Sequence, residues 1–352
     1  IPRHDGGSGR HDGHAGGVTS PSPVRLSILD LAIINRGQTA RDAFDTSVAT
    51  AQRAEQLGYE RIWYAEHHSM DSIASSATSV LIGHIAGQTS TIRLGAGGVM
   101  LPNHSPLVIA EQFGTLETLF PGRIDLGLGR APGSDQATMR ALRRDHRSAD
   151  SFPDDVLELL AFLKGDSRIK GVQAVPGAGT NVPLYILGSS LFGARVAAAF
   201  GLPYGFASHF APAALVDAVG LYREEFQPSE QLAEPYVIAG VNVVAAPTRE
   251  EADEQHRYVR RRRLERFLTT PRELTDEEAD EILASPQGAQ IAQMMHYTAV
   301  GTGAHVKEYL DGFVELSGAD ELMVVHPSPT LEQRIASLEL LAAHPPAGQA
   351  AA

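Results

Sequence analysis

The alternation of short apolar runs with longer helical segments constrains the fold of this chain more than any other feature. Eight β-branched or apolar runs begin at Val24, Tyr59, Thr91, Arg123, Val182, Leu202, Tyr236 and Asp320. Runs of this kind between helical segments are typical of βαβ units, whose strands form a parallel sheet. Eight parallel strands favour closure, so the sequence predicts an α/β protein folded as a single (β/α)8 TIM barrel.

The helical segments each carry one apolar face. Between the first two runs, apolar residues recur at steps of three and four, and Gly58 should end the helix: Phe44, Val48, Ala51, Ala54 and Leu57. The same spacing returns near the end of the chain, after two prolines, at Leu331, Ile335, Leu338 and Leu341. Both segments are predicted to pack outside the barrel, the second as its eighth helix.

The length of the chain leaves room for segments outside a minimal barrel. A barrel of this type needs about 250 residues, and the chain has 352. Residues 1–23 are rich in Gly, Ser, Pro and His and predict a disordered leader or an expression remnant. Residues 24–344 form the predicted barrel, and residues 345–352 a flexible tail.

An insertion is predicted at about residues 247–300, between the seventh strand and its helix. Because it leaves from the carboxyl end of a strand, it can cover the pocket as a lid. It contains four consecutive arginines at 260–263 beside several glutamates. Such a run is typical of a solvated helical face, and an anion site is the alternative.

Composition excludes several classes of function. The chain has 29 Lys and Arg against 42 Asp and Glu, a formal charge of -13, which argues against a nucleic-acid partner. The absence of cysteine excludes disulfides, thiolate catalysis and cysteine-bound metals. No apolar run approaches the roughly 20 residues that span a bilayer. We therefore expect a cytoplasmic protein that does not bind membranes.

The carboxyl ends of the predicted strands carry small, cationic and imidazole residues, where barrel enzymes have their active sites. Gly188, Ser189 and Ser190 end the fifth strand and open a helix, whose free backbone N–H groups suit a phosphate. An ordinary serine N-cap is the alternative. Arg130, after the fourth strand, adds a charge that suits phosphate, with a structural ion pair as the alternative.

A pair of histidines follows the second strand. His67 and His68 come after Glu66, but the spacing of a zinc motif is absent and adjacent extended residues point apart, so no metal is predicted. A neutral imidazole at a barrel mouth can stabilise a developing anion or move a proton, and a satisfied rim histidine is the alternative. The glycines from Gly127 miss the dinucleotide spacing, which argues against a Rossmann dehydrogenase.

Three segments closely resemble the luciferase-like, flavin-dependent monooxygenases: residues 60–68 (ERIWYAEHH), 94–135 and 187–208. The resemblance extends from Val24 to Leu341. It implies a (β/α)8 barrel that uses reduced FMN and O2, through a flavin C4a-peroxide, to oxidise an organic small molecule, as in secondary-metabolite tailoring. It also implies a separate flavin reductase and a homodimer, for which we expect contacts through helices at residues 74–86 and 107–119.

The resemblance assigns roles to particular residues. The family's active-site histidine falls on His67, and its non-prolyl cis peptide behind the flavin ring falls on Gly97 and Gly98. Its phosphate turn falls on Gly188, Ser189 and Ser190, with Arg130 beside it, and Ala32 at the first strand exit is expected to bind cofactor as well.

One departure concerns luciferase itself, which has an acidic residue in the phosphate turn and a cysteine before the arginine. Ser189 and Gly129 stand at those places here, which argues against aldehyde luminescence. Two alternatives to the FMN monooxygenase remain open. One is a deazaflavin (F420)-dependent oxidoreductase of the same superfamily, and the other is a flavin-binding protein without turnover.

Overall fold

The computed structural model describes residues 23–131, 136–268 and 272–348. Almost all of the predicted leader and part of the predicted tail lie outside these ranges. Within them, no helix combines the length and the apolar character needed to cross a bilayer.

Eight parallel strands close into a barrel. Their order is β6-β5-β4-β3-β2-β1-β9-β7, and β6 pairs with β7 to complete the circle. The strands are β1 (Arg25–Asp30), β2 (Arg61–Tyr64), β3 (Arg93–Met100), β4 (Ile124–Gly129), β5 (Leu184–Gly188), β6 (Tyr204–Phe206), β7 (Val237–Ala245) and β9 (Glu321–Val325). Each begins within one of the eight predicted runs, so the predicted TIM barrel is confirmed.

A ninth strand was not predicted. β8 (Thr298–Gly301) pairs in parallel with the second half of β7, from Asn242 to Ala245. It has only four residues, the last of which is Gly301, so its sequence carries no clear strand pattern. It extends the sheet at β7 without entering the closed barrel.

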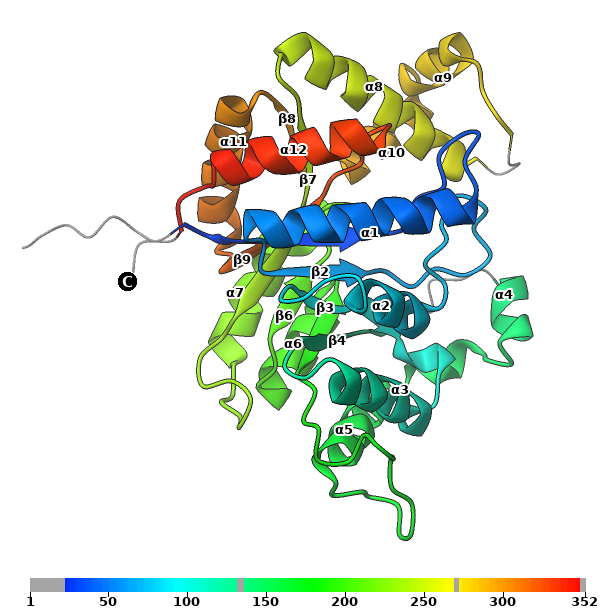
Figure 1. The fold of residues 1–352 in the computed structure, drawn as a ribbon, viewed down its shortest axis with the longest axis vertical. Helices are drawn as coiled ribbons and strands as arrows, with labels where there is room; N and C mark the ends of the chain where they lie inside the picture. The colour runs from blue at the N-terminus through cyan, green and yellow to red at the C-terminus, as the bar shows by residue number, and fades with distance from the viewer. Residues whose placement is uncertain (1–22, 132–135, 269–271, 349–352) are drawn as a thin grey trace, which may run out of the picture.

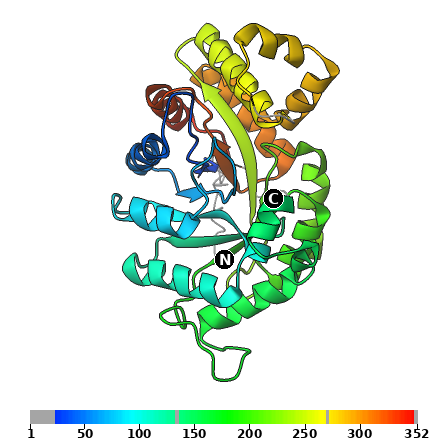
Figure 2. The same cartoon turned by 90° about the vertical axis from the view of Figure 1, so that its right-hand side faces the viewer.

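Helices surround the strands in a ring (Figures 1 and 2). They are α1 (Ala40–Leu57), α2 (Thr78–Ala86), α3 (Pro106–Leu119), α4 (Gln136–Ala141), α5 (Phe152–Lys164), α6 (Leu191–Phe200), α7 (Leu215–Glu225), α11 (Gly303–Ser317) and α12 (Leu331–Ala343). Both helices predicted from spacing are confirmed, and Gly58 ends α1 in the left-handed conformation, with φ 79°.

The start of α2 differs from the prediction. The helix begins at Thr78 rather than at Ala74. The amide of Ala74 donates to the carbonyl of Ala32, and the Ser75 hydroxyl donates to the carbonyl of Leu31. These contacts tie the segment before α2 to the loop after β1, so its backbone cannot begin the helix there.

The barrel interior is apolar toward the mouth and charged on the opposite side. An interior cluster contains Leu29, Trp63, Tyr185 and Met323. Below it, Arg61 donates to Glu321 and Asp125 at 2.9 and 2.7 Å, and to the Tyr185 hydroxyl at 2.8 Å. Both carboxylates are fully buried, so this network fills the floor of the barrel with paired charges.

The segment predicted as an insertion holds α8 (Arg249–Arg266), α9 (Asp276–Leu283), α10 (Pro286–Met294) and β8, between β7 and α11. Figure 2 shows α8, α9 and α10 grouped at one side of the helical ring. They share a small core of their own: Val259, Leu264, Leu274, Ala279, Ile291 and Met295. Arg261 of α8 pairs with Asp276 and Asp280 of α9, which holds the two helices together.

Candidate active site

All of the predicted site residues lie at or just beyond the carboxyl ends of the barrel strands. Ala32 follows β1, His67 follows β2, Gly97 and Gly98 lie in β3, and Arg130 follows β4. Gly188 is the last residue of β5, and Ser189 and Ser190 lead into α6. Since the strands are parallel, these positions share one end of the barrel, its mouth.

The peptide bond between Gly97 and Gly98 is cis, as predicted. The pairing of β3 with β4 shifts register between Ala96 and Val99, so the strand bulges here. A Cβ on Gly97 would lie 2.8 Å from Leu29 and Trp63 atoms, and one on Gly98 would lie 2.7 Å from the Gly127 carbonyl oxygen. Only glycine fits at either position, and the bulge therefore presents bare backbone at the mouth.

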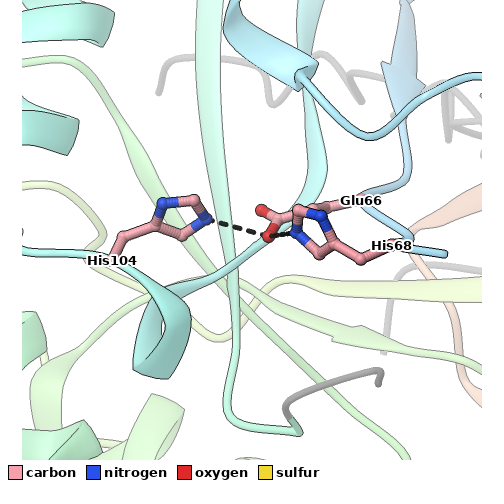
Figure 3. A group of neighbouring side chains, drawn as sticks. All are labelled: Glu66, His68 and His104. Atoms are coloured by element: carbon pink, nitrogen blue, oxygen red, sulfur yellow. Dashed lines mark hydrogen bonds and ion pairs between the residues drawn. The ribbon is translucent and has the colours of Figure 1, made fainter. Parts of the chain in front are cut away.

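Glu66 is the centre of a cluster that sequence reasoning did not find (Figure 3). Its Oε1 lies 2.8 Å from Nε2 of both His68 and His104, and its Oε2 accepts from the Met100 amide at 3.0 Å. Burial alone would raise the pKa of Glu66, but the hydrogen bonds and charge of these partners lower it. The carboxylate therefore ties the end of β2 to the end of β3.

The same three side chains have the composition of a metal site, with their ligand atoms within 4.8 Å of one another. Each histidine already uses the nitrogen nearest the carboxylate for a hydrogen bond to it. We therefore interpret the cluster as a hydrogen-bonded support for the loop that carries His67. His104 lies just before α3 in the stretch Asn103-His104-Ser105, and nothing in that spacing predicts its pairing with Glu66.

His67 differs from its neighbour His68. Its Nδ1 is buried and has no hydrogen-bond partner among the described residues. Burial lowers the pKa of His67, the Glu66 carboxylate opposes this effect, and the charge of Arg266 adds to it. The imidazole is therefore neutral near pH 7, with one ring nitrogen left free for another group.

A second histidine with an unpaired ring nitrogen lies after β6. The Nδ1 of His209 is buried and has no hydrogen-bond partner in the described part of the chain, and a Cβ on Gly240 of β7 would lie 2.4 Å from it. Burial, together with the charge of Arg263 and the neighbouring His67, lowers the pKa of His209 to about 3. His209 follows β6 and His67 follows β2, and barrel closure brings the ends of these strands to the same mouth.

The turn before α6 is held through its carbonyls, since Tyr204 donates to Ser190 and Ala207 donates to Gly188. Ser190 is the N-cap residue in an extended conformation, yet its side chain makes no capping hydrogen bond. The Arg130 guanidinium lies 4.1 Å from the centroid of the Phe192 ring and forms no ion pair with any described residue. Among the described residues, Ser190 therefore does not cap the helix and Arg130 forms no ion pair.

A cavity of about 450 Å³ opens beside this turn. Its wall includes Ser189, the loop that begins at Phe210, and the α10 residues Gln290, Gln293 and Met294. The phosphate-type turn and the inserted helices thus border the same space.

Ala32 holds a turn rather than presenting a side chain. It is a non-glycine residue in the left-handed region, with φ 47°, and its amide donates to Oδ1 of Asp30 at 3.0 Å. Arg334 and Ser47 also donate to Asp30. Asp30 therefore fixes the turn, and the carbonyl of Ala32 accepts from Ala74 in the loop before α2.

Comparison with known proteins gives a consistent result. The family model described as luciferase-like monooxygenase matches residues 24–321. The chain belongs to this family. It is 47% identical over 324 residues to a luciferase-like monooxygenase of Escherichia coli strain K12, covering 90% of this chain and 96% of that protein.

Solved structures share the fold of this chain. The crystal structure of apo-MsnO8 superposes with a TM-score of 0.82 at 35% identity, covering 91% of this chain and 98% of that one. The oxygenating constituent of 3,6-diketocamphane monooxygenase of Pseudomonas putida, in complex with FMN, has a TM-score of 0.70 at 17% identity, covering 93% and 100%. At that low identity the second likeness concerns the fold alone.

Proposed function

We propose that this protein is a monooxygenase that uses reduced FMN and O2 to oxidise an organic small molecule. The observation that carries the proposal is the presence, at one barrel mouth, of a free phosphate-type turn and a neutral histidine with an unpaired nitrogen. Membership of the luciferase-like monooxygenases supports the reaction class. The FMN complex on the same fold supports the cofactor.

The residues at the mouth suit FMN. The first N–H groups of α6, the Ser190 hydroxyl and the Arg130 guanidinium would hold the phosphate, because none of them has a competing polar partner among the described residues. The side-chain-free backbone at Gly97 and Gly98 would lie against the flavin ring, with Ala32 two strands away at the end of β1. Reduced FMN bound there supplies the electrons that activate O2 for insertion of one oxygen atom into the substrate.

His67 would act at the reacting edge of this site. Being neutral, it can donate a hydrogen bond from one ring nitrogen and accept at the other, and so hold a proton at Nδ1 or release it. Glu66 limits the motion of the segments on either side of it through hydrogen bonds to His68, His104 and the Met100 amide. The loop around His67 is therefore preorganised, although the ring nitrogen itself remains available.

Exclusion of water would come from two sides. The paired charges around Arg61 close the barrel floor, and α8, α9 and α10 would cover the mouth as a lid. We further propose that a separate reductase in the cytoplasm supplies the reduced flavin. A homodimer would form through α2 and α3, where Val80 and Leu119 are 72% and 64% exposed.

An anaerobic titration tests the cofactor and the reaction together. The protein is titrated with reduced FMN and, separately, with reduced F420, and O2 is then admitted. We expect tight binding of reduced FMN and O2 uptake that precedes H2O2 release. Preference for F420 without O2 uptake would establish the deazaflavin alternative, and FMN binding without any change in its oxidation kinetics would establish a binding protein without turnover.

The role of His67 is tested in the same experiment by His67→Gln. We expect nearly unchanged FMN affinity and a shorter delay between O2 uptake and H2O2 release. His84→Gln, an exposed histidine on α2, is the matched control and should behave as the unmodified protein. An unchanged delay in His67→Gln would leave His67 as an ordinary residue of the rim.

A further inference from the structure

The arginine-rich helix α8 directs its arginines to different places. Arg261 pairs with Asp276 and Asp280, and Arg262 pairs with Glu265. These two charges are therefore neutralised within the inserted segment. Arg263 and Arg266 form no hydrogen bond or ion pair with any residue in the described ranges, although both side chains are partly buried.

Arg263 and Arg266 face the barrel mouth. They are three residues apart, so they lie on the same side of the helix. Burial and the charge of Arg263 lower the pKa of His209 after β6, and burial and the charge of Arg266 lower the pKa of His67 after β2. Glu265, which lies between them in the sequence, accepts from Arg36 in the loop after β1, so this end of α8 lies at the barrel mouth, near the two histidines.

The end of α8 is fixed in this position. Arg36, in the loop between β1 and α1, donates to Oε1 of Glu265 at 2.6 Å and to the carbonyl of Leu274 at 2.8 Å. Glu265 also accepts from Arg262 and from the Leu274 amide. The nearest acidic side chain on the helix is thus fully engaged and does not pair with Arg266.

Within the described ranges neither cation forms an ion pair, although the charge of Glu265 partly offsets burial of Arg266 by raising its pKa, and two close cations are unfavourable in a partly buried space. Burial, with the charge of Arg266, lowers the pKa of Arg263 to about 10. Neither His67 nor His209 carries a compensating negative charge. An anion between the two guanidinium groups would remove this imbalance and could also bond to the free imidazole nitrogens.

We infer that Arg263 and Arg266 bind the anionic group of the substrate, which is therefore an organic acid with a carboxylate or similar oxyanion. Its uncharged end would extend toward His67 and the glycine bulge of β3. The inference rests on the proposed function, because it assigns the substrate of that reaction to a chemical class. The phosphate of the flavin is the competing anion, and the experiment separates the two.

Hexanoate and 1-hexanol are suitable probes, because they share an apolar chain and differ in charge. Binding is measured by calorimetry on the full chain, with and without saturating oxidised FMN. We expect hexanoate to bind and 1-hexanol to bind at least tenfold more weakly. Arg263→Met and Arg266→Met should each weaken hexanoate binding about 10- to 100-fold, as for loss of a charged hydrogen bond.

The controls separate charge from structure. Arg257→Met removes an exposed arginine from the same helix and should leave hexanoate affinity within about twofold. Arg263→Lys should restore most of the affinity lost in Arg263→Met, because it returns the charge. Without any probe, Arg263→Met should melt at or slightly above the temperature of the unmodified protein, since it removes an unpaired cation.

Three results would overturn the inference. The first is that the unmodified protein does not prefer hexanoate over 1-hexanol. The second is that Arg263→Met binds hexanoate as tightly as the unmodified protein, and the third is that Arg263→Met binds FMN more weakly but riboflavin equally well. The last would assign the arginines to the flavin phosphate. The hexanoate titration uses neither reduced flavin nor O2. If the protein prefers hexanoate but takes up no O2 when O2 is admitted after the anaerobic titration, only the proposed reaction is rejected, and the anion site stands.

Discussion

Arg130 and Ser190 provide the sharpest test of how this barrel would hold a flavin. Arg130 lies over the Phe192 ring and has no ion pair among the described residues, and the Ser190 hydroxyl makes no capping bond. A serine that caps a helix usually contributes about 1 kcal/mol to stability. That contribution is absent here, so Ser190→Ala should change the free energy of unfolding by less than about 0.5 kcal/mol.

The cost should instead appear in binding. A hydrogen bond to a charged group contributes about 1.5 to 3 kcal/mol, which corresponds to roughly 12- to 150-fold in Kd. We expect a loss in this range for FMN in Arg130→Ala, and a smaller loss in Ser190→Ala. Riboflavin lacks the phosphate, so its affinity should stay within about threefold in both variants.

Calorimetric titration with FMN and with riboflavin, alongside urea unfolding, measures these quantities. Arg195→Ala is a suitable control. This arginine lies in α6, the helix that Ser190 precedes, but it is largely exposed and its nearest ion-pair partner, Glu225, is 3.8 Å away. Equal losses for FMN and riboflavin in Arg130→Ala would refute the phosphate assignment. In that case the arginines at positions 140, 143, 144 and 147 would be the next candidates.

Further predictions concern stability, assembly and metal. Burial and the charge of Arg334 lower the pKa of His326 in the folded protein to about 3, from its ordinary 6.5. The unfolded chain therefore binds a proton at this histidine before the folded protein does, so the free energy of unfolding falls as the pH drops below 6.5. At pH 5 that loss should be about 2 kcal/mol, and urea unfolding of His326→Gln should show a shallower decline; the same decline in both proteins would contradict this. Light scattering should give a dimer that Val80→Glu with Leu119→Glu converts to a monomer of 37.6 kDa, and a monomeric unmodified protein would reject the interface. Treatment with EDTA should leave FMN affinity and O2 uptake unchanged, whereas a loss restored by a divalent ion would assign a metal to Glu66, His68 and His104.

The fold was predictable because strand and helix patterns are local. The spacing of residues from Phe44 to Leu57 and the glycine at 58 specify α1 without reference to the rest of the chain. β8 was missed because its four residues are ordered by pairing with β7. The early start predicted for α2 failed for a related reason, since contacts with the loop after β1 decide where that helix begins.

The candidate site was predictable only where position along a strand determines location. His67, Arg130 and Ser190 could be expected at the mouth because each follows a recognisable strand. The bond between His104 and Glu66 joins residues 38 positions apart, and no periodicity in the sequence reports it. Arg261 and Arg262 have ion-pair partners and Arg263 has none in the described ranges, a difference that depends on how α8 packs against α9. The sequence alone therefore does not distinguish these arginines.

The separate core of α8, α9 and α10 has a consequence for how such enzymes diversify. Its apolar residues pack mainly with one another, whereas the barrel helices pack on the sheet. Substitutions on the inner face of these helices can therefore alter what the mouth accepts while the barrel packing stays unchanged. The segment is in this respect an exchangeable part, and transplanting residues 247–300 from one relative to another is a direct route to altered substrate choice on a constant catalytic frame.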